Sequence, residues 1–507
     1  MPAALQRNGR VPFHCGCPMK RLTEAGPVFS RICSMLRPIS AALALVVPLA
    51  GFILWWDAAG HAIPAASRVL AEAALPPGTR ASLRRPNASG KAVELSAVAR
   101  IGREMFFDPS LSDSGQLACA SCHRPDHAYG PANGLAVQIG GRGMGNSGVR
   151  AVPSLEYLEH TPNFTIGPNS AVPETDAPPP AAVAPPVGTE VAAVPKADKN
   201  SAALIAAEAN VPQGGLDWDG RADTIQSQAT GPLLDPNEMA NRNLGEVLAR
   251  LKKASYAEDL KKLFGAHIFD EPDLAVNEAM FALARFQIED PSFHPYDSKY
   301  DAYLRGKATL SKAEMRGLKL FEDPHKGNCS SCHIDKASRD GLFPPAFTDY
   351  QFEALGAPRN RAIPANRDPH YYDLGLCGPY RKDYAQAAAY CGLFKTPTLR
   401  NVATRKAFFH NGVFHSLKEV LDFYVERATE PGKSYPKLPN GKIDLYDDLP
   451  PQYKRNIDVV DAPFDGKRGD KPALDNEEIA DVIAFLKTLT DGYRPDQNPA
   501  GANQSKR

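Results

Sequence analysis

Apolar residues recur at the 3.6-residue spacing of an amphipathic helix in several separate segments of this chain. The clearest such segment is 274–287, in which apolar positions line one helical face. We also expect helices at 93–107, 244–253, 312–321 and 476–489. The pattern therefore predicts a mostly α fold.

Another predicted helix begins with a capping box. Ser416 is placed to cap the first turn, and Glu419 stands three residues later, where it can return the interaction. The helix that follows has one face made of Leu417, Val420, Leu421 and Tyr424. Taken alone, a tyrosine at this spacing is more often a core aromatic residue than a ligand.

One long apolar run lies near the start of the chain, at 39–56, and Arg31 and Arg37 precede it. The run is long for a secretory signal and close to the shortest length that spans a membrane. Gly60-His61-Ala62 offers a cleavage site with small residues. We therefore expect residues 1–62 to be an export leader, either a cleaved signal peptide or a retained membrane anchor. The mature protein would then lie in the periplasm.

The composition changes sharply between about 171 and 200, where Ala, Pro and Val dominate. Such a segment cannot build a packed core, so we expect a flexible insertion at about 165–214. The remaining chain divides into an N-terminal domain, 63–300, a C-terminal domain, 301–492, and a tail, 493–507. Lys plus Arg and Asp plus Glu are equal at 58 each, so no global charge favours nucleic acid.

The candidate chemistry lies in two copies of the pentapeptide Cys-x-x-Cys-His. The first copy has Cys119, Cys122 and His123, and the second has Cys329, Cys332 and His333. Two thiols at this spacing can add across the vinyl groups of one haem, and the adjacent histidine can bind the iron. The alternative is a zinc site built from paired Cys-x-x-Cys. A zinc site would not require a histidine after each second cysteine, so we expect two covalent c-type haems.

The two pentapeptides share the residues that precede them. Each is preceded by Gly, then Phe four residues on, Asp six on and Pro seven on; these are Gly102, Phe106, Asp108 and Pro109 in the first copy and Gly317, Phe321, Asp323 and Pro324 in the second. A repeated unit at long period indicates a duplicated domain. We therefore expect two cytochrome c-like domains, in each of which a helix before the haem motif packs against a helix at the domain's end.

Two further cysteines follow the second motif. Cys377 and Cys391 lie in a glycine-containing loop, and outside the cytoplasm such a pair usually forms a disulfide. The alternative is two free buried thiols.

Few methionine or histidine residues are available as sixth ligands of the two irons. No methionine follows His333, so the sixth ligand of the second haem is a histidine, another donor or nothing. The histidines available to it are His370, His410 and His415. For the first haem, Met144, Met239, His127 and His160 are conceivable, and none has a spacing that compels ligation.

An open face on the first haem would admit peroxide or oxygen. Peroxide chemistry needs an acid/base group near the iron, and Glu238 and Gln228 are candidates that composition alone would place at the surface. Trp218 is the only tryptophan outside the leader. Trp218 is either a packing residue or a relay for electrons between the haems.

Several strings in this chain resemble the bacterial di-haem cytochrome c peroxidases and the related MauG proteins. The strings are 106–112 with 119–123, 218–221 with Gln228, Gly231, Pro232 and Glu238, and 394–402 with 409–412. The resemblance implies that the N-terminal haem reacts with hydrogen peroxide, with Glu238 and Gln228 on its distal side. It also implies that the second haem stores or relays electrons and that Trp218 lies between the haems.

The subfamilies differ in two ligands. The peroxidases carry a distal histidine in a glycine-rich loop and a methionine after the Phe-His-x-Gly string. This chain has no histidine in 140–145 and has Tyr424 at the methionine position, as the MauG proteins do. The resemblance therefore implies Tyr424 as an iron ligand. The family's bound calcium takes an asparagine that is Ala151 here, which leaves calcium an open question.

These features predict a periplasmic oxidoreductase that reduces hydrogen peroxide. Its electrons would come from a small cytochrome c or cupredoxin, or from a side chain of a protein substrate. The alternative is a di-haem electron-transfer cytochrome without catalytic activity. It requires both irons to be six-coordinate, with no position free for peroxide.

Overall fold

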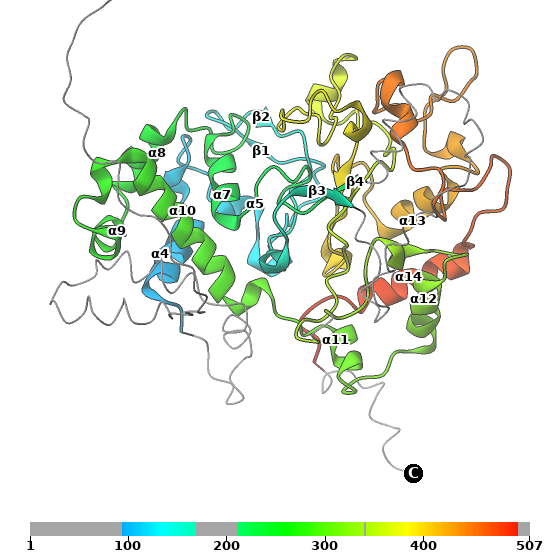
Figure 1. The fold of residues 1–507 in the computed structure, drawn as a ribbon, viewed down its shortest axis with the longest axis horizontal. Coiled ribbons are helices and arrows are strands. Elements are labelled where there is room, and N and C mark those ends of the chain that lie inside the picture. The colour runs from blue at the N-terminus through cyan, green and yellow to red at the C-terminus, as the bar shows by residue number, and fades with distance from the viewer. Residues whose placement is uncertain (1–93, 169–209, 339–340, 495–507) are drawn as a thin grey trace, which may run out of the picture. The chain divides into compact units, whose positions relative to one another are not determined.

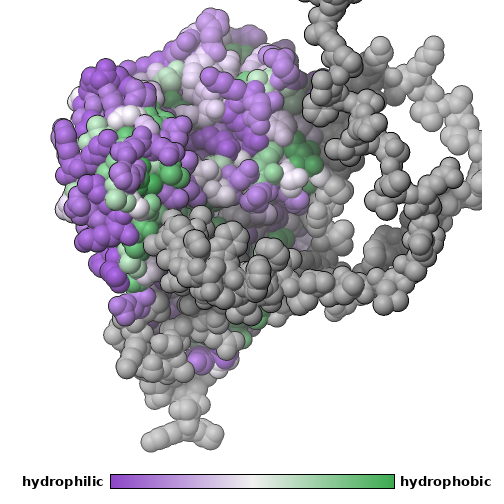
Figure 2. Space-filling view, turned by 60° about the vertical axis from the view of Figure 1, so that its left-hand side comes forward, coloured by the Kyte–Doolittle hydropathy of each residue, from purple (hydrophilic) through white to green (hydrophobic). Residues whose placement is uncertain are grey.

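The computed structural model describes residues 94–168, 210–338 and 341–494 (Figure 1). The predicted leader, most of the predicted insertion and nearly all of the tail lie outside these ranges. Within them, none of the helices has both the length and the apolarity needed to cross a membrane. The face drawn in Figure 2 is mostly hydrophilic, with narrow strips of hydrophobic residues.

The first half of the described chain is built on helices. These are α4 (Ala97–Phe106), α5 (Cys119–Cys122), α7 (Ile225–Leu234), α8 (Leu244–Leu251), α9 (Ala257–Phe264) and α10 (Pro272–Glu289). Helix α4 begins where the Ser96 side chain accepts a hydrogen bond from the Ala99 amide, and α10 begins at a proline, which suits the first helical position. The apolar faces of α4 and α10 pack together in a core of residues between 98 and 293.

The second half repeats this plan with α11 (Lys299–Leu304), α12 (Lys312–Glu322), α13 (Leu417–Glu426) and α14 (Asn476–Lys487). Capping boxes begin α12, α13 and α14, and that of α13 is the predicted pair Ser416 and Glu419. Helices α12 and α14 pack in a separate core of residues between 300 and 489.

Helix α4 lies beside α10, and α12 lies beside α14 (Figure 1). Each pair makes its closest approach at the repeated glycine. A Cβ atom on Gly102 would lie 1.9 Å from the Ala282 carbonyl oxygen, and one on Gly317 would lie 1.9 Å from the Asp481 carbonyl oxygen. Only glycine permits such an approach of two backbones. The repeated phenylalanines then meet a phenylalanine of the opposite helix at centroid distances of 5.6 Å for Phe106 with Phe286 and 5.2 Å for Phe321 with Phe485.

All predicted helices are present within a few residues of the expected bounds. Helices α5, α7, α9 and α11 were not predicted, and α5 is a single turn. Helix α7 contains Gly231 and Pro232, which obscure a helical pattern, and α9 and α11 are short.

Strands are few in the described residues. Three antiparallel pairs form: β1 (Ile139–Gly140) with β2 (Asn146–Ser147), β3 (Thr165–Pro168) with β4 (Asn210–Gln213), and β5 (Phe352–Glu353) with β6 (Phe394–Lys395). Strands β3 and β4 fall inside the predicted insertion of 165–214 and pair its two ends, so that only 169–209 remain outside the described chain.

Short 3₁₀ turns connect these elements. They are Pro109–Leu111, Pro125–His127, Leu158–His160, Ile268–Asp270, Pro291–Phe293, Cys329–Ser331, Pro364–Arg367, Ala388–Tyr390, Val402–Thr404, Pro431–Lys433 and Pro451–Asn456.

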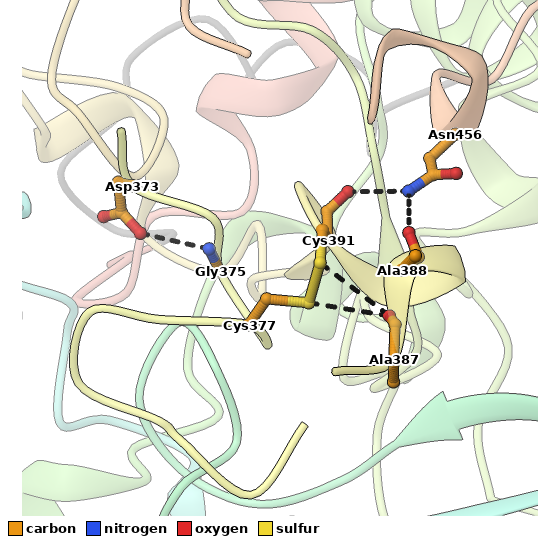
Figure 3. Close-up of a disulfide and its surroundings, with 7 residues drawn as sticks. All are labelled: Asp373, Gly375, Cys377, Ala387, Ala388, Cys391 and Asn456. Atoms are coloured by element: carbon orange, nitrogen blue, oxygen red, sulfur yellow. Dashed lines mark hydrogen bonds between the residues drawn. A yellow bond between two sulfur atoms is a disulfide. The ribbon is translucent and has the colours of Figure 1, made fainter. Parts of the chain in front are cut away.

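A disulfide joins Cys377 to Cys391 (Figure 3). Both cysteines are buried, and the Asn456 side chain donates hydrogen bonds to the carbonyl oxygens of Ala388 (2.7 Å) and Cys391 (2.9 Å). The Gly375 amide beside the disulfide donates to the Asp373 carboxylate at 3.1 Å. The disulfide thus closes a loop that the 3₁₀ turn at 451–456 holds in place.

Candidate functional site

The first Cys-x-x-Cys-His motif forms a single helical turn, α5. Both thiols are free, and the His123 amide donates to the Cys119 carbonyl at 2.9 Å. Upstream, the Asp108 carboxylate caps the turn at 109–111 and also accepts a hydrogen bond from the Tyr256 hydroxyl at 2.7 Å. The repeated Asp-Pro therefore fixes where the chain leaves α4 and approaches the motif.

The second motif forms a tight turn of the same kind. The His333 amide donates to the Cys329 carbonyl at 2.8 Å, and both thiols are free. Asn328, in the left-handed region with φ +48°, precedes the motif and donates from its side chain to the Ala462 carbonyl at 3.0 Å.

The two histidines are held alike. His123 Nδ1 lies 2.9 Å from the Tyr129 carbonyl oxygen, and His333 Nδ1 lies 3.0 Å from the Phe347 carbonyl oxygen. Both acceptor residues have positive φ, at +49° and +53°. A proton on Nδ1 leaves the Nε2 lone pair free for a metal.

Burial also keeps both imidazoles neutral. It lowers the pKa of His123 and of His333 to about 4. Neutral imidazole is the form that binds iron, so both histidines suit the role of proximal ligand.

A cavity of about 290 Å³ lies beside the second motif. Its walls include Cys329, Cys332, His333, Tyr424, Trp218 and Gln228. Two thiols, a neutral imidazole and a largely apolar lining form the donor set that a covalent haem requires, so the residues fit the group.

Tyr424 enters this cavity from α13. Its ring packs on Phe464 (5.2 Å between centroids) and lies parallel to Phe409 (6.0 Å). Burial, and then the charges of Cys332 and Cys329, raise the pKa of the Tyr424 hydroxyl. The structure thus brings Tyr424 and His333 to one cavity.

The alternative ligands of the second haem are placed differently. His370 and His415 are exposed and lie outside the lining of this cavity. His410 lines the cavity, but its ring stacks on Phe394 at 3.5 Å and burial lowers its pKa to about 4.

Glu238 lies in the turn that follows α7. Its amide donates to the Asp235 carbonyl at 3.0 Å, and its own carbonyl accepts from the Gly141 amide at 2.8 Å. A Cβ atom on Gly140 would lie 2.4 Å from the Asn237 carbonyl oxygen. The glycine-rich β1–β2 hairpin is therefore pressed directly onto the Glu238 turn, which explains why glycines are needed there.

Glu238 is exposed to solvent, and its charge acts on Cys122 of the first motif. Desolvation by the surrounding protein atoms, and then the charge of Asp235, raise the pKa of Glu238 to about 7. Burial raises the pKa of Cys122 to about 11, and the Glu238 charge contributes to the same shift. A carboxyl group with this pKa can both accept and donate a proton near neutral pH.

Gln228 and Trp218 line the cavity beside the second motif. Gln228 lies on α7, and its side-chain amide donates to Asp217 at 3.1 Å. The Trp218 indole N–H donates to the Ala151 carbonyl at 2.7 Å, and the Trp218 carbonyl accepts from the Lys395 amide at 2.9 Å. Trp218 thus joins a loop of the first half to a strand of the second half.

The other candidates for the first haem are spread out. Met144 and Met239 pack in the first core, against which Cys119 also packs. His127 lies beside the cavity of the second motif, and the His160 ring stacks near Phe343 at 3.9 Å.

Sequence reasoning missed a buried charge network around Trp218. Arg150 forms ion pairs at 2.7 Å with Asp219 and with Asp373, and Arg221 pairs with Asp217 and Asp219. The alternation of acids and Arg221 around Trp218 was a usable signal. Asp373 had none, because it lies more than 150 residues away in the chain.

Comparison with known proteins gives one consistent result. A family model described as di-haem cytochrome c peroxidase matches residues 96–309. The methylamine utilization protein MauG of Paracoccus denitrificans is 31% identical over 79% of this chain and 90% of its own. Cytochrome c551 peroxidase of Nitrosomonas europaea is 24% identical over 80% of this chain and 82% of its own. The crystal structure of the diheme peroxidase BthA from Burkholderia thailandensis superposes with a TM-score of 0.65, at 33% identity over 80% of this chain and 88% of that one.

Proposed function

The chain belongs to the family of di-haem cytochrome c peroxidases and MauG proteins, and we propose that it is a periplasmic oxidoreductase that reduces hydrogen peroxide at its N-terminal haem. The observation that carries the proposal is the unequal surroundings of two like motifs. An acid with a pKa of about 7 acts on the first motif, and a tyrosine lines the cavity beside the second.

Two haem c groups are held by the two motifs in this proposal. Cys119 and Cys122 attach the first, with His123 as ligand, and the second motif does the same with Cys329, Cys332 and His333. The common register of the two helix crossings supports an origin by duplication, with domains at 63–300 and 301–492. When bound, the haem irons supply the redox equivalents for peroxide reduction.

Glu238 moves the protons. Reduction of H₂O₂ to two waters consumes two electrons and two protons, and a proton must pass from one peroxide oxygen to the other. The Glu238 carboxyl can accept the first and return it, because its pKa lies close to the working pH. Gln228, on helix α7 just before the Glu238 turn, would orient the reactant.

Tyr424 is the proposed sixth ligand of the second haem. An anionic phenolate favours ferric iron and lowers the reduction potential, so the second haem would store oxidising equivalents. Its presence in one cavity with His333 supports this role. Trp218, held by its indole hydrogen bond, would relay electrons between the two haems.

Two sources of electrons fit this arrangement. A small cytochrome c or cupredoxin is the donor in a peroxidase, and a side chain of a protein substrate is the donor in a MauG-like enzyme. The absence of a histidine in 140–145 together with Tyr424 favours the second source.

The direct test adds one equivalent of hydrogen peroxide to the purified diferric protein without reductant. We expect a prompt change in the haem spectrum of the wild type and a much slower change in Glu238→Gln. A reaction that begins only after one haem has been reduced would contradict the open first site and indicate a gated peroxidase. No reaction in either state would favour the electron-transfer cytochrome.

A further inference from the structure

The calcium that the family resemblance implies does not fit the residues of this chain. Ala151 occupies the position where the asparagine ligand of the metal is expected, and Ala151 is 3% exposed. Its amide donates to the His410 carbonyl at 2.6 Å, and its carbonyl accepts from the Trp218 indole at 2.7 Å. Ala151 therefore has no side-chain oxygen to offer, and its own carbonyl is already engaged.

The surroundings of Ala151 also lack the ligands of a hard cation. Calcium takes six to eight oxygens, usually with carboxylates among them. Across 94–168, 210–338 and 341–494, no cluster of three or more Asp, Glu, His or Cys side chains is arranged to hold a metal ion. The cavity bordered by Gly130, Ala151, Val152 and Arg405 measures about 10 Å³, room for one water at most.

The Arg405 side chain borders this small cavity and also the larger cavity beside the second motif. Arg405 Nη2 donates to the Val152 carbonyl at 2.9 Å, and Arg405 Nη1 lies 3.5 Å from where a Cβ atom on Gly130 would stand. The side chain thus reaches from the second half of the chain to two loops of the first half, one following His123 and one containing Ala151.

Arg405 is a partly buried cation without a carboxylate partner in the described residues. Burial is the one influence on its pKa, which falls to about 10, so the group stays charged at neutral pH. Its Nη1 faces Gly130, which follows Tyr129, the residue whose carbonyl oxygen accepts from His123 Nδ1. Arg150, whose side chain is 6% exposed, has two carboxylate partners.

We propose that the Arg405 guanidinium takes the place of the calcium ion in this chain and makes the protein independent of calcium. A guanidinium group binds carbonyl oxygens through its N–H groups, as a metal ion binds them directly. Its positive charge repels a second cation at the same place. Arg405 is thereby a positioning residue: it fixes the 151–152 segment, to which the Trp218 indole is bonded.

The first experiment measures calcium in the holoprotein purified without chelator. We expect no stoichiometric calcium by elemental analysis. We also expect thermal unfolding midpoints in EGTA and in excess Ca²⁺ to agree within about 2 °C, the shift a small stability change produces in a domain of this size. One bound calcium per chain, or a lower midpoint in EGTA, would overturn the proposal.

The second experiment restores the asparagine ligand of calcium and removes the charge of Arg405. In the double variant Ala151→Asn/Arg405→Gln, we expect Ca²⁺ to bind at least about tenfold more tightly than in wild type, because an oxygen ligand replaces a repelling charge. Arg405→Lys is the matched control, since it keeps the charge, and it should bind no Ca²⁺. If the double variant gains no affinity, Arg405 does not occupy the metal's place.

The reduction potentials of both haems give a readout that is independent of activity. In Arg405→Gln we expect the first haem's potential to change more than in Arg405→Lys, because a fixed charge near His123 is lost. Equal potentials in the two variants would contradict the role of the charge. All of these results hold or fail whether or not the protein reduces peroxide, so they separate this inference from the proposed function.

Discussion

The two motif regions of this molecule share one arrangement, a crossing of two helices followed by the Cys-x-x-Cys-His turn, which we call the frame. They differ in the side chains that face that frame. In each, a glycine lets two helices touch, a phenylalanine one turn on fills the contact, and a histidine donates to a carbonyl of a positive-φ aromatic residue. The first region then meets Glu238 from the turn after α7, and the second meets Tyr424 from α13.

This difference teaches where function is determined. The frame depends on local sequence, since the Gly-Phe-Asp-Pro string and its motif lie within about twenty residues of each other. The opposite side is supplied by elements more than ninety residues away in the chain. Two copies of one attachment frame can therefore take different chemical roles without changing the frame.

The largest effect should come from Tyr424→Phe. Loss of the oxygen ligand should raise the reduction potential of the second haem by on the order of 200 mV, since axial ligands set haem potentials over about 0.8 V. Spectroelectrochemistry measures the shift, and the first haem should stay unchanged. Tyr435→Phe is the control, a buried tyrosine that bonds the Gly356 carbonyl. Equal potentials in wild type and Tyr424→Phe would show that Tyr424 is a packing residue and not an iron ligand.

The next effect concerns Glu238→Gln. The rate of peroxide reaction should fall by about 10³-fold, within the range for a lost acid/base group, while both haem spectra persist. Because the carboxylate form accepts the proton, the wild-type rate should rise with pH through about 7 and the variant rate should not. Stopped-flow measurements between pH 5 and 9 test both points, with exposed Glu258→Gln as control. A wild-type rate independent of pH would argue against Glu238 as the base.

The frame itself is tested by Gly102→Ala and Gly317→Ala. Each added methyl would meet a backbone oxygen, so each should cost roughly 3 kcal/mol, the upper end for an overpacked core. The first should disturb the spectrum of the first haem and the second that of the second haem. Gly231→Ala on α7 is the control, because nothing lies within 4 Å of the added methyl. Similar stability in all three variants would show that the crossings are not close.

The smallest effect should follow removal of the disulfide. Cys377→Ala with Cys391→Ala should destabilise by about 2 kcal/mol in chemical denaturation. The loop it closes carries Arg381, which donates to the Asp219 and Gly220 carbonyls beside Trp218. Hydrogen exchange should therefore increase at the Trp218 turn and stay unchanged across α4 and α10. Faster exchange in α4 would mean that the disulfide supports the first frame too.

The sequence predicted the frame better than the surroundings. Helical spacing and the repeated string were sufficient for α4, α10, α12 and α14, because those signals are local. The packing of a helix before each motif against a helix at the domain's end was predicted and is confirmed. That Gly102 is the point of closest contact was not predictable, since nothing near Gly102 identifies the residue it meets. Arg405 and Asp373 gave no signal, because their roles depend on segments more than two hundred residues away.

The measurement that tests the central claim most directly is a cyanide titration of the diferric protein. Cyanide binds an iron with an open position, so its stoichiometry counts open faces. We predict one cyanide per chain, a spectral change confined to the first haem, and a second cyanide only in Tyr424→Phe. Two cyanides in the wild type would contradict the closed second site, and none would contradict the open first site on which the proposed function depends.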